Sequence, residues 1–242
     1  MRLIYKFFIL LCLLFCHSCY DADYYGTAHY QASHWINTYV DTNAPQIIGG
    51  IDLGKYRIDV EFYNKDNNKA NRYYSKEFAD VSGKNQSEEQ LRKFIQLASK
   101  NNDILQWEPW YETSGDSRKN QFYYKGGTLY ALTKGIKQIE LVSDADFDEE
   151  HPAGSSLMDY VNLNVDIYGD QMGKTSLPAE IIYGTRREKM YAEYSLKELS
   201  VVGTWFILKL TTLPTLSKNH NLTVAITFDD GEVYTDMVEA KF

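Results

Sequence analysis

The sequence predicts a mainly β protein. We expect an antiparallel β-sandwich of immunoglobulin-like architecture over residues 47–242, with one α-helical insertion. Three observations predict this class. Apolar and polar residues alternate in several segments, as in 56–62 and 161–167, which is the period of a half-buried strand. The spacing of a helix is clear near 87–100. The C-terminal segment has the pattern of a hairpin that turns at Asp230-Gly231. Many strands with few helices are typical of sandwich folds.

Residues 1–18 have the composition of a lipoprotein signal peptide. Arg2 and Lys6 supply the positive start, a short apolar core follows them, and Ser18 is a small residue before Cys19. The apolar core is too short to span a membrane. We expect cleavage before Cys19 and lipidation of Cys19, which would attach the protein to a membrane through lipid alone. The alternative is a plain secretory signal with incidental cysteines.

Cysteine content and charge exclude several classes of function. The three cysteines are Cys12, Cys16 and Cys19, so the chain after residue 19 can form neither a disulfide nor a thiolate metal site. The formal net charge of -8 argues against nucleic acid as a partner, because the phosphate backbone attracts basic proteins. Glycine-rich phosphate loops and the GxSxG nucleophile motif are absent from the sequence.

The elements are expected in the following order. Residues 19–46 are predicted to form a tether, and their many aromatic residues indicate that part of it packs on the domain. The strand at 56–62 places one set of residues inward (Tyr56, Ile58, Val60 and Phe62) and another outward (Arg57, Asp59 and Glu61). Ser87 and Gln90 form a capping box at the start of the helix. The apolar face of that helix is expected to consist of Leu91, Phe94, Ile95 and Ala98.

The second half of the chain is predicted to consist mostly of strands. Short strands are expected at 129–132 and 137–141, and a longer one at 161–167 has Asn162, Asn164 and Asp166 on its polar face. Residues 205–210 are apolar on both faces, which is typical of a central strand. The pattern of 189–200 fits either a helix or a strand.

An acidic cluster follows the predicted strand at 137–141. Asp144, Asp146 and Asp148 alternate along the chain and are the candidate ligands of a calcium ion, which binds six to eight oxygen atoms. The EF-hand pattern fails, because Glu149 stands where glycine is needed and Ser155 where a bidentate glutamate is needed. The alternative is a solvated acidic loop between strands. No other cofactor is expected.

A cluster of aromatic residues is the candidate ligand-binding surface. Trp107, Trp110 and Tyr111 lie close together in sequence beside Glu108 and Glu112, a composition that sugar-binding platforms use. The two carboxylates could also serve glycoside hydrolysis, although nothing in the sequence places them across a scissile bond. The alternative is that both tryptophans pack in the core. No catalytic residue is assigned.

The chain resembles the small lipoproteins of Bacteroidetes that are grouped under domains of unknown function. The signal that ends in Ser18-Cys19, the segment 143–155 and the closing hairpin carry this resemblance. It implies a Gram-negative cell envelope and an outer-membrane anchor, on the cell surface or the periplasmic face. We therefore expect a lipid-anchored binding or accessory protein whose ligand is a glycan or an envelope protein. The alternative is a glycan-acting hydrolase that uses Glu108, Glu112 or the carboxylates of 144–150.

Overall fold

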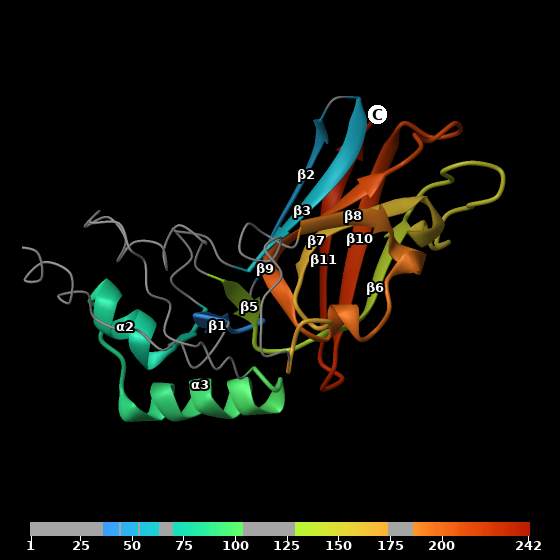
Figure 1. Ribbon diagram of the computed structural model, residues 1–242. Coiled ribbons are helices and arrows are strands. Elements are labelled where there is room, and N and C mark those ends of the chain that lie inside the picture. The colour runs from blue at the N-terminus through green and yellow to red at the C-terminus, as the bar shows by residue number, and fades with distance from the viewer. Residues whose placement is uncertain (1–35, 44, 53, 63–69, 104–128, 174–185) are drawn as a thin grey trace, which may run out of the picture.

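The protein is mainly β and is built around three sheets (Figure 1). This confirms the β-rich class and the antiparallel character that the alternating segments predict. The computed structural model describes residues 36–43, 45–52, 54–62, 70–103, 129–173 and 186–242. Within these residues, no helix is both long enough and apolar enough to cross a bilayer.

The largest sheet has five antiparallel strands in the order β2-β3-β9-β7-β8. Their bounds are β2 (Gln46–Asp52), β3 (Lys55–Glu61), β7 (Val161–Ile167), β8 (Arg186–Met190) and β9 (Val202–Leu210). The strands predicted at 56–62 and 161–167 correspond to β3 and β7. Strand β9 is central, as its apolar run predicts, and it lies between β3 and β7.

A second sheet has three antiparallel strands in the order β11-β10-β6. They are β6 (Ile136–Ser143), β10 (Asn219–Phe228) and β11 (Val233–Lys241). The predicted hairpin is confirmed, and Gly231 in its turn has a φ of 89°, a conformation that glycine adopts without strain. Leu222, Val224, Ile226 and Phe228 are fully buried, as their alternation predicts.

One hydrophobic core is shared by the inward faces of these two sheets. It joins Val60 and Phe206 of the five-stranded sheet with Ile139 and Val224 of the three-stranded one. Phe62, directly after β3, lies 6.2 Å from the ring of Phe206 and 6.1 Å from that of Phe228. The two sheets therefore depend on the same buried side chains for their stability.

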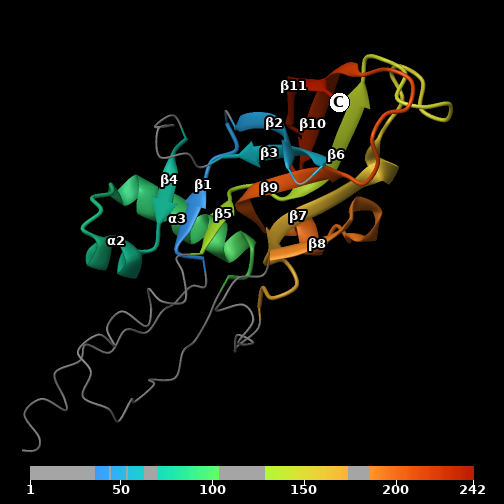
Figure 2. The same ribbon diagram turned by 90° about the horizontal axis from the view of Figure 1, so that it is seen from above.

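A third, smaller sheet has the order β4-β1-β5 and lies at one side of the larger sheets (Figure 2). Its strands are β1 (Thr38–Val40), β4 (Arg72–Tyr74) and β5 (Tyr130–Leu132). Strand β1 pairs with β4 antiparallel and with β5 parallel, so antiparallel pairing does not hold throughout. All three residues of β1 are buried. Strand β1, within the segment 19–46 that was predicted as a tether, is thus part of the folded domain, and residues 19–35 lie outside the described part of the chain.

The helical insertion contains two α-helices within the described residues, α2 (Lys76–Ser82) and α3 (Glu88–Lys100), where one was predicted. Helix α3 begins at the predicted capping box of Ser87 and Gln90. It buries Phe94, Leu97 and Ala98, whereas Ile95, predicted on the apolar face, is 48% exposed. Helix α2 escaped prediction because it is too short to show a period; it is capped by Ser75 and Gly83 and buries Phe78 and Ala79.

The segment 189–200, which fits either a helix or a strand by sequence, takes neither form throughout. Strand β8 ends at Met190, and two turns of 3-10 helix follow, η3 (Tyr191–Glu193) and η4 (Glu198–Ser200). Another such turn, η2 (Met158–Tyr160), precedes β7. Tyr194, directly after η3, donates from its hydroxyl to the carbonyls of Leu163 in β7 and Arg187 in β8, so this segment holds the two strands together.

Candidate functional site

The predicted site residues divide into two groups. The lipidation site, the aromatic cluster and its two carboxylates lie outside the described residues and stay predictions: Cys19, Trp107, Glu108, Trp110, Tyr111 and Glu112. The acidic cluster is described and lies in the loop between β6 and η2. Its contacts can therefore be compared with the predicted calcium site.

The carboxylates of the acidic loop each hold a different part of the loop or of its neighbour β10. Asp144 accepts hydrogen bonds from the backbone and side chain of Asn221, at 2.7 and 2.6 Å. Asp146 accepts one from the backbone of Ala153 at 2.8 Å. Asp148 accepts from two backbone groups further along the loop. Across the described ranges, no group of three or more His, Cys, Asp or Glu side chains is arranged to hold a metal ion. The contacts described here are those of an acidic loop between strands that is held together by its own hydrogen bonds, and calcium binding stays a prediction.

His151 lies between two carboxylates in this loop. Its Nδ1 is 2.8 Å from Asp148 and its Nε2 is 3.0 Å from Asp159. A carboxylate can only accept, so both contacts are satisfied when both ring nitrogens carry hydrogen. The hydrogen bond to Asp148, opposed by burial and helped by Asp159, raises the pKa of His151. His151 thus acts as a clip that joins Asp148 to Asp159 and closes the loop against Tyr160, whose ring centroid is 4.5 Å away.

We expect this clip to give the protein a pH-dependent stability. A raised pKa in the folded state means that the stabilisation is complete below the unfolded value of 6.5 and is lost as the pH rises through the folded value. The stability advantage of the native chain over a His151→Gln variant should therefore shrink as the pH rises from about 5 to 8. Urea unfolding of both proteins across this range measures it. Parallel stability curves would show that His151 is not protonated in the fold.

The outer face of the five-stranded sheet brings together two polar rows that the sequence predicts separately. Because β3 and β7 both flank β9, their outward residues surround the outward residues of β9. Glu61 lies opposite Trp205 in the register, and Asp59 lies opposite Ile207. On the other side Asn164 also lies opposite Ile207. The result is one continuous surface, the Trp205 face, which consists of Asp59, Glu61, Asn164, Asp166, Arg186 and Trp205.

Trp205 is the centre of this surface. It is 36% exposed, and its indole Nε1 donates a hydrogen bond to Asp59 at 3.1 Å. The guanidinium carbon of Arg186 lies 3.7 Å from the centroid of the indole ring, a cation–π stack. Arg186 also donates from Nε to the side-chain oxygen of Asn164. Residues from β3, β7, β8 and β9 thus meet at one aromatic ring.

The charges beside Trp205 are incompletely satisfied within the described residues. Burial lowers the pKa of Arg186 against the attraction of Asp166 and Asp59. Burial likewise raises the pKa of Asp166 against the attraction of Arg186. The Nη2 of Arg186 is buried and has no hydrogen-bond partner in the described ranges. An unsatisfied buried donor costs about 1–3 kcal/mol, so burial of this guanidinium opposes the stabilisation that its contacts with Trp205 and Asn164 provide.

Ion pairs hold the rest of the face in place. Arg57 pairs with Asp59 and, at 3.1 Å, with Asp52. Lys209 contacts Glu188 at 2.6 Å, and this hydrogen bond lowers the pKa of Glu188 against the effect of burial. These contacts fix the orientation of charged side chains from β2, β3, β8 and β9 on the outer side of the sheet.

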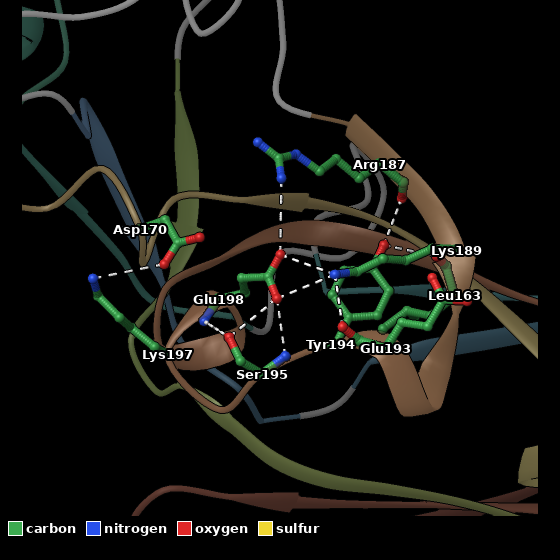
Figure 3. A network of polar contacts seen from close by, with 9 residues as sticks. All are labelled: Leu163, Asp170, Arg187, Lys189, Glu193, Tyr194, Ser195, Lys197 and Glu198. Carbon is green, nitrogen blue, oxygen red and sulfur yellow. Dashed lines mark hydrogen bonds and ion pairs between the residues drawn. The ribbon is translucent and has the colours of Figure 1, made fainter.

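The opposite side of β8 is anchored by a network around Glu198, which Figure 3 shows. Lys189 donates to both carboxylate oxygens of Glu198, at 3.0 and 3.2 Å. Ser195 donates to the same carboxylate from its backbone and its hydroxyl, at 2.9 and 3.0 Å. Although burial acts to raise it, these hydrogen bonds lower the pKa of Glu198. Side chains alternate along a strand, so Lys189 and Arg186, three residues apart on β8, lie on opposite faces. Anchoring Lys189 on the inner face therefore directs Arg186 to the outer face.

Sequence reasoning predicted the polar rows of this face but not its centre. Trp205 belongs to a run that is apolar on both sides, and such a run predicts complete burial. Arg186 lies in no predicted element. One signal could have indicated that Trp205 points outward. The strands β3 and β7 each have a polar outer face, so the strand between them must also present some of its residues on that side.

Comparison with known proteins identifies no relative of this chain. No protein-family model, curated protein or solved structure matches the chain. The contacts of the Trp205 face are therefore the basis for the function proposed next.

Proposed function

We propose that the protein is a lipid-anchored, extracytoplasmic binding or accessory protein of the cell envelope, and that it binds its ligand on the Trp205 face. The observation that carries the proposal is the partly exposed indole with Arg186 stacked at 3.7 Å and polar groups around it. Tryptophan and arginine are the residues that contribute most strongly to binding surfaces. Arg186, which also donates to Asn164, adds a charged group beside the ring.

A glycan is the ligand that this chemistry fits best. Sugars present apolar C–H groups to an aromatic ring and hydroxyl groups to carboxylates and amides. Asp59 and Asn164 lie in the same surface as Trp205, where Asp59 accepts from the indole and Asn164 accepts from Arg186. A protein ligand is the second candidate of the same binding function, because tryptophan and arginine also dominate protein interfaces.

The location and the finer architecture belong to the same proposal. We infer that Cys19 carries the lipid and that the protein resembles small Bacteroidetes lipoproteins of the outer membrane, on the cell surface or the periplasmic face. We also infer an immunoglobulin-like sandwich, which the core shared by the two larger sheets supports. In that arrangement the Trp205 face looks away from the core and toward solvent.

A glycan array probed with the full chain tests the proposal. We expect one glycan class to bind and Trp205→Ala to weaken that binding about tenfold or more, because the ring is the centre of the surface. Leu216→Ala, at a residue that is 56% exposed outside the Trp205 face, is the matched control and should bind normally. Circular dichroism checks that both variants fold. An array without any bound glycan, together with a pull-down without any bound protein, would contradict the proposal.

The alternative of a glycan-acting hydrolase rests on residues of two kinds. Glu108 and Glu112 lie outside the described part of the chain. The aspartates at 144, 146 and 148 make their contacts within the loop and to β10. The observations on the described residues therefore favour binding. Mass spectrometry of a bound glycan after incubation distinguishes the two functions, because a binding protein leaves it intact.

A further inference from the structure

The loop of residues 144–156, the acidic loop, closes one end of the shared core with the ring of Phe147. This ring is fully buried, and its centroid lies 5.9 Å from that of Tyr160 and 5.6 Å from that of His220. The carbonyl of Phe147 accepts a hydrogen bond from the backbone of Thr215 at 2.8 Å. Phe147 therefore joins the loop both to the core and to the segment that precedes β10.

Negative charge accumulates around this loop, whose residues 144–156 include no Lys or Arg. The carboxylates of the loop and of η2 that follows it are Asp144, Asp146, Asp148, Glu149, Glu150 and Asp159. In the described part of the chain, the ion pairs of these carboxylates are formed with His151 alone. Like charges at close range repel one another, so a cation among them has a large effect. His151 is the residue that can supply it.

His151 is also the residue that fastens the loop. It is 8% exposed, and its ring lies between Asp148 of the loop and Asp159 of η2. Its own carbonyl accepts a hydrogen bond from the backbone of Phe147 at 2.9 Å. A displacement of His151 is therefore transmitted directly to the residue that closes the core.

The groups around His151 leave its own charge as the one that changes near neutral pH. The titratable groups that face His151 or the rings beside it are Asp148, Glu150, Asp159, Tyr160 and His220. Burial raises the pKa of Asp148, but hydrogen bonds with His151 and Tyr160 outweigh it and lower this pKa overall. Burial, and then the contact with Asp148, raises the pKa of Tyr160. The segment 211–217, which packs on the loop through Phe147, contains no charged side chain.

We propose that the acidic loop is a pH-operated latch, which is closed while a charged His151 bridges Asp148 and Asp159 and is released when His151 loses its proton. A neutral imidazole donates from only one nitrogen, so one of the two carboxylates then faces a lone pair. The remaining charges of the loop also lose their cation. The hydrogen bond to Asp148 raises the pKa of His151, so the latch is closed in acid and opens as the pH rises through the folded value.

Release of the latch is expected to be local. The strands β6, β10 and β11 stay paired with one another, because the contacts of His151 lie outside their ladders. Opening withdraws Phe147 from the rings of Tyr160, His220 and Phe242, the last of which is 6.1 Å away. The pH would then control access to this end of the core. The latch goes beyond the proposed binding function and does not depend on it.

Limited proteolysis of the full chain tests the latch. A protease that cleaves beside exposed aromatic residues can cut at Phe147 only when the loop opens, so the rate of this cut measures the open population. Mass spectrometry identifies the cut, and a peptide of residues 143–157 corrects for the pH dependence of the protease. We expect the corrected rate to rise about tenfold between about pH 5.5 and 8.5. The rate should depend little on urea, because a local opening exposes little surface.

Two variants assign the rise to the His151 bridge. His151→Gln has no charge to lose, so its cut should be about tenfold faster than that of the native chain at about pH 5.5 and equally fast at about pH 8.5. Asp159→Asn keeps the histidine but removes one carboxylate, so its rise should be smaller. Asp170→Asn makes the same charge change outside the loop, at a residue that pairs with Lys197, and is the matched control. Circular dichroism checks that each variant folds.

Three results would overturn the proposal. The first is a corrected rate that is the same at both pH values. The second is an equal rise in His151→Gln, because another group would then open the loop. The third is a rate that increases steeply with urea, since unfolding of the whole domain would then expose Phe147.

Discussion

Replacing Phe62 with alanine is expected to lower the free energy of unfolding by about 3–5 kcal/mol. The ring is fully buried and contacts Phe206 of one large sheet and Phe228 of the other. Its removal leaves a cavity at the junction of the two sheets, which the surrounding strands cannot fill without shifting. Chemical denaturation of the native chain and the variant measures the difference.

A conservative change and a surface change control this prediction. Phe62→Leu keeps an apolar side chain in the same space and should cost clearly less than Phe62→Ala. Leu213→Ala, at a side chain that is 46% exposed, should change stability by no more than about 0.5 kcal/mol. A small loss in Phe62→Ala, equal to that in Leu213→Ala, would mean that the two sheets do not share a core at this residue.

Replacing Lys189 with methionine is expected to destabilise the fold by about 2 kcal/mol. The change keeps the length of the side chain but leaves the carboxylate of Glu198 buried with its main cation removed. Lys189 is partly solvated, so the loss is smaller than for a fully buried pair. Thermal or urea unfolding measures it. Glu198→Gln in the same chain should recover part of the loss, because the uncompensated charge is then absent.

The pH dependence of this network has a defined sign. The pKa of Glu198 is lowered in the fold, so its stabilisation is present above the unfolded value of 4.5 and is lost as the pH falls through the folded value. The difference between the native chain and Lys189→Met should therefore shrink in acid. Lys197→Met is the matched control, because Lys197 is 74% exposed and lies 3.8 Å from Asp170. An equal loss in both variants would contradict the role of Glu198.

The sequence predicts where the longer strands of this protein lie better than it predicts which elements pack against one another. Alternation along 56–62 and 161–167 identifies β3 and β7 because one face of each is buried and the other is wet. The capping box of Ser87 likewise marks the start of α3. Strand β1 escapes prediction because three residues are too few to show a period. Strand β1 is buried because it packs against β4, β5 and α3, all of which come much later in the sequence.

The candidate site shows the same division. The polar residues of β3 and β7 are recognisable, but only the strand order β3-β9-β7 brings them to the same aromatic ring. The sequence predicts that Trp205 is buried, because it lies in the same apolar run as the buried residues Phe206 and Leu208. Arg186 follows residues 174–185, which lie outside the described part of the chain. Its position depends on its pairing with β7 and on the anchor of β8 by Glu198, which the sequence pattern of 189–200 does not reveal.

The position of β1 has a mechanical consequence. For a domain held by its N-terminal segment, a pulling force enters at Ile36 and runs along β1, which is hydrogen-bonded on both sides by β4 and β5. Force along the axis of a strand loads all of its hydrogen bonds together, as in shear, instead of opening them one at a time. Asp103, which accepts a hydrogen bond from the backbone of Ile36 at 3.2 Å, adds a clamp at the point of entry. Under such a load, the small sheet would be the first part of the described fold to bear the force, and it would bear it in shear.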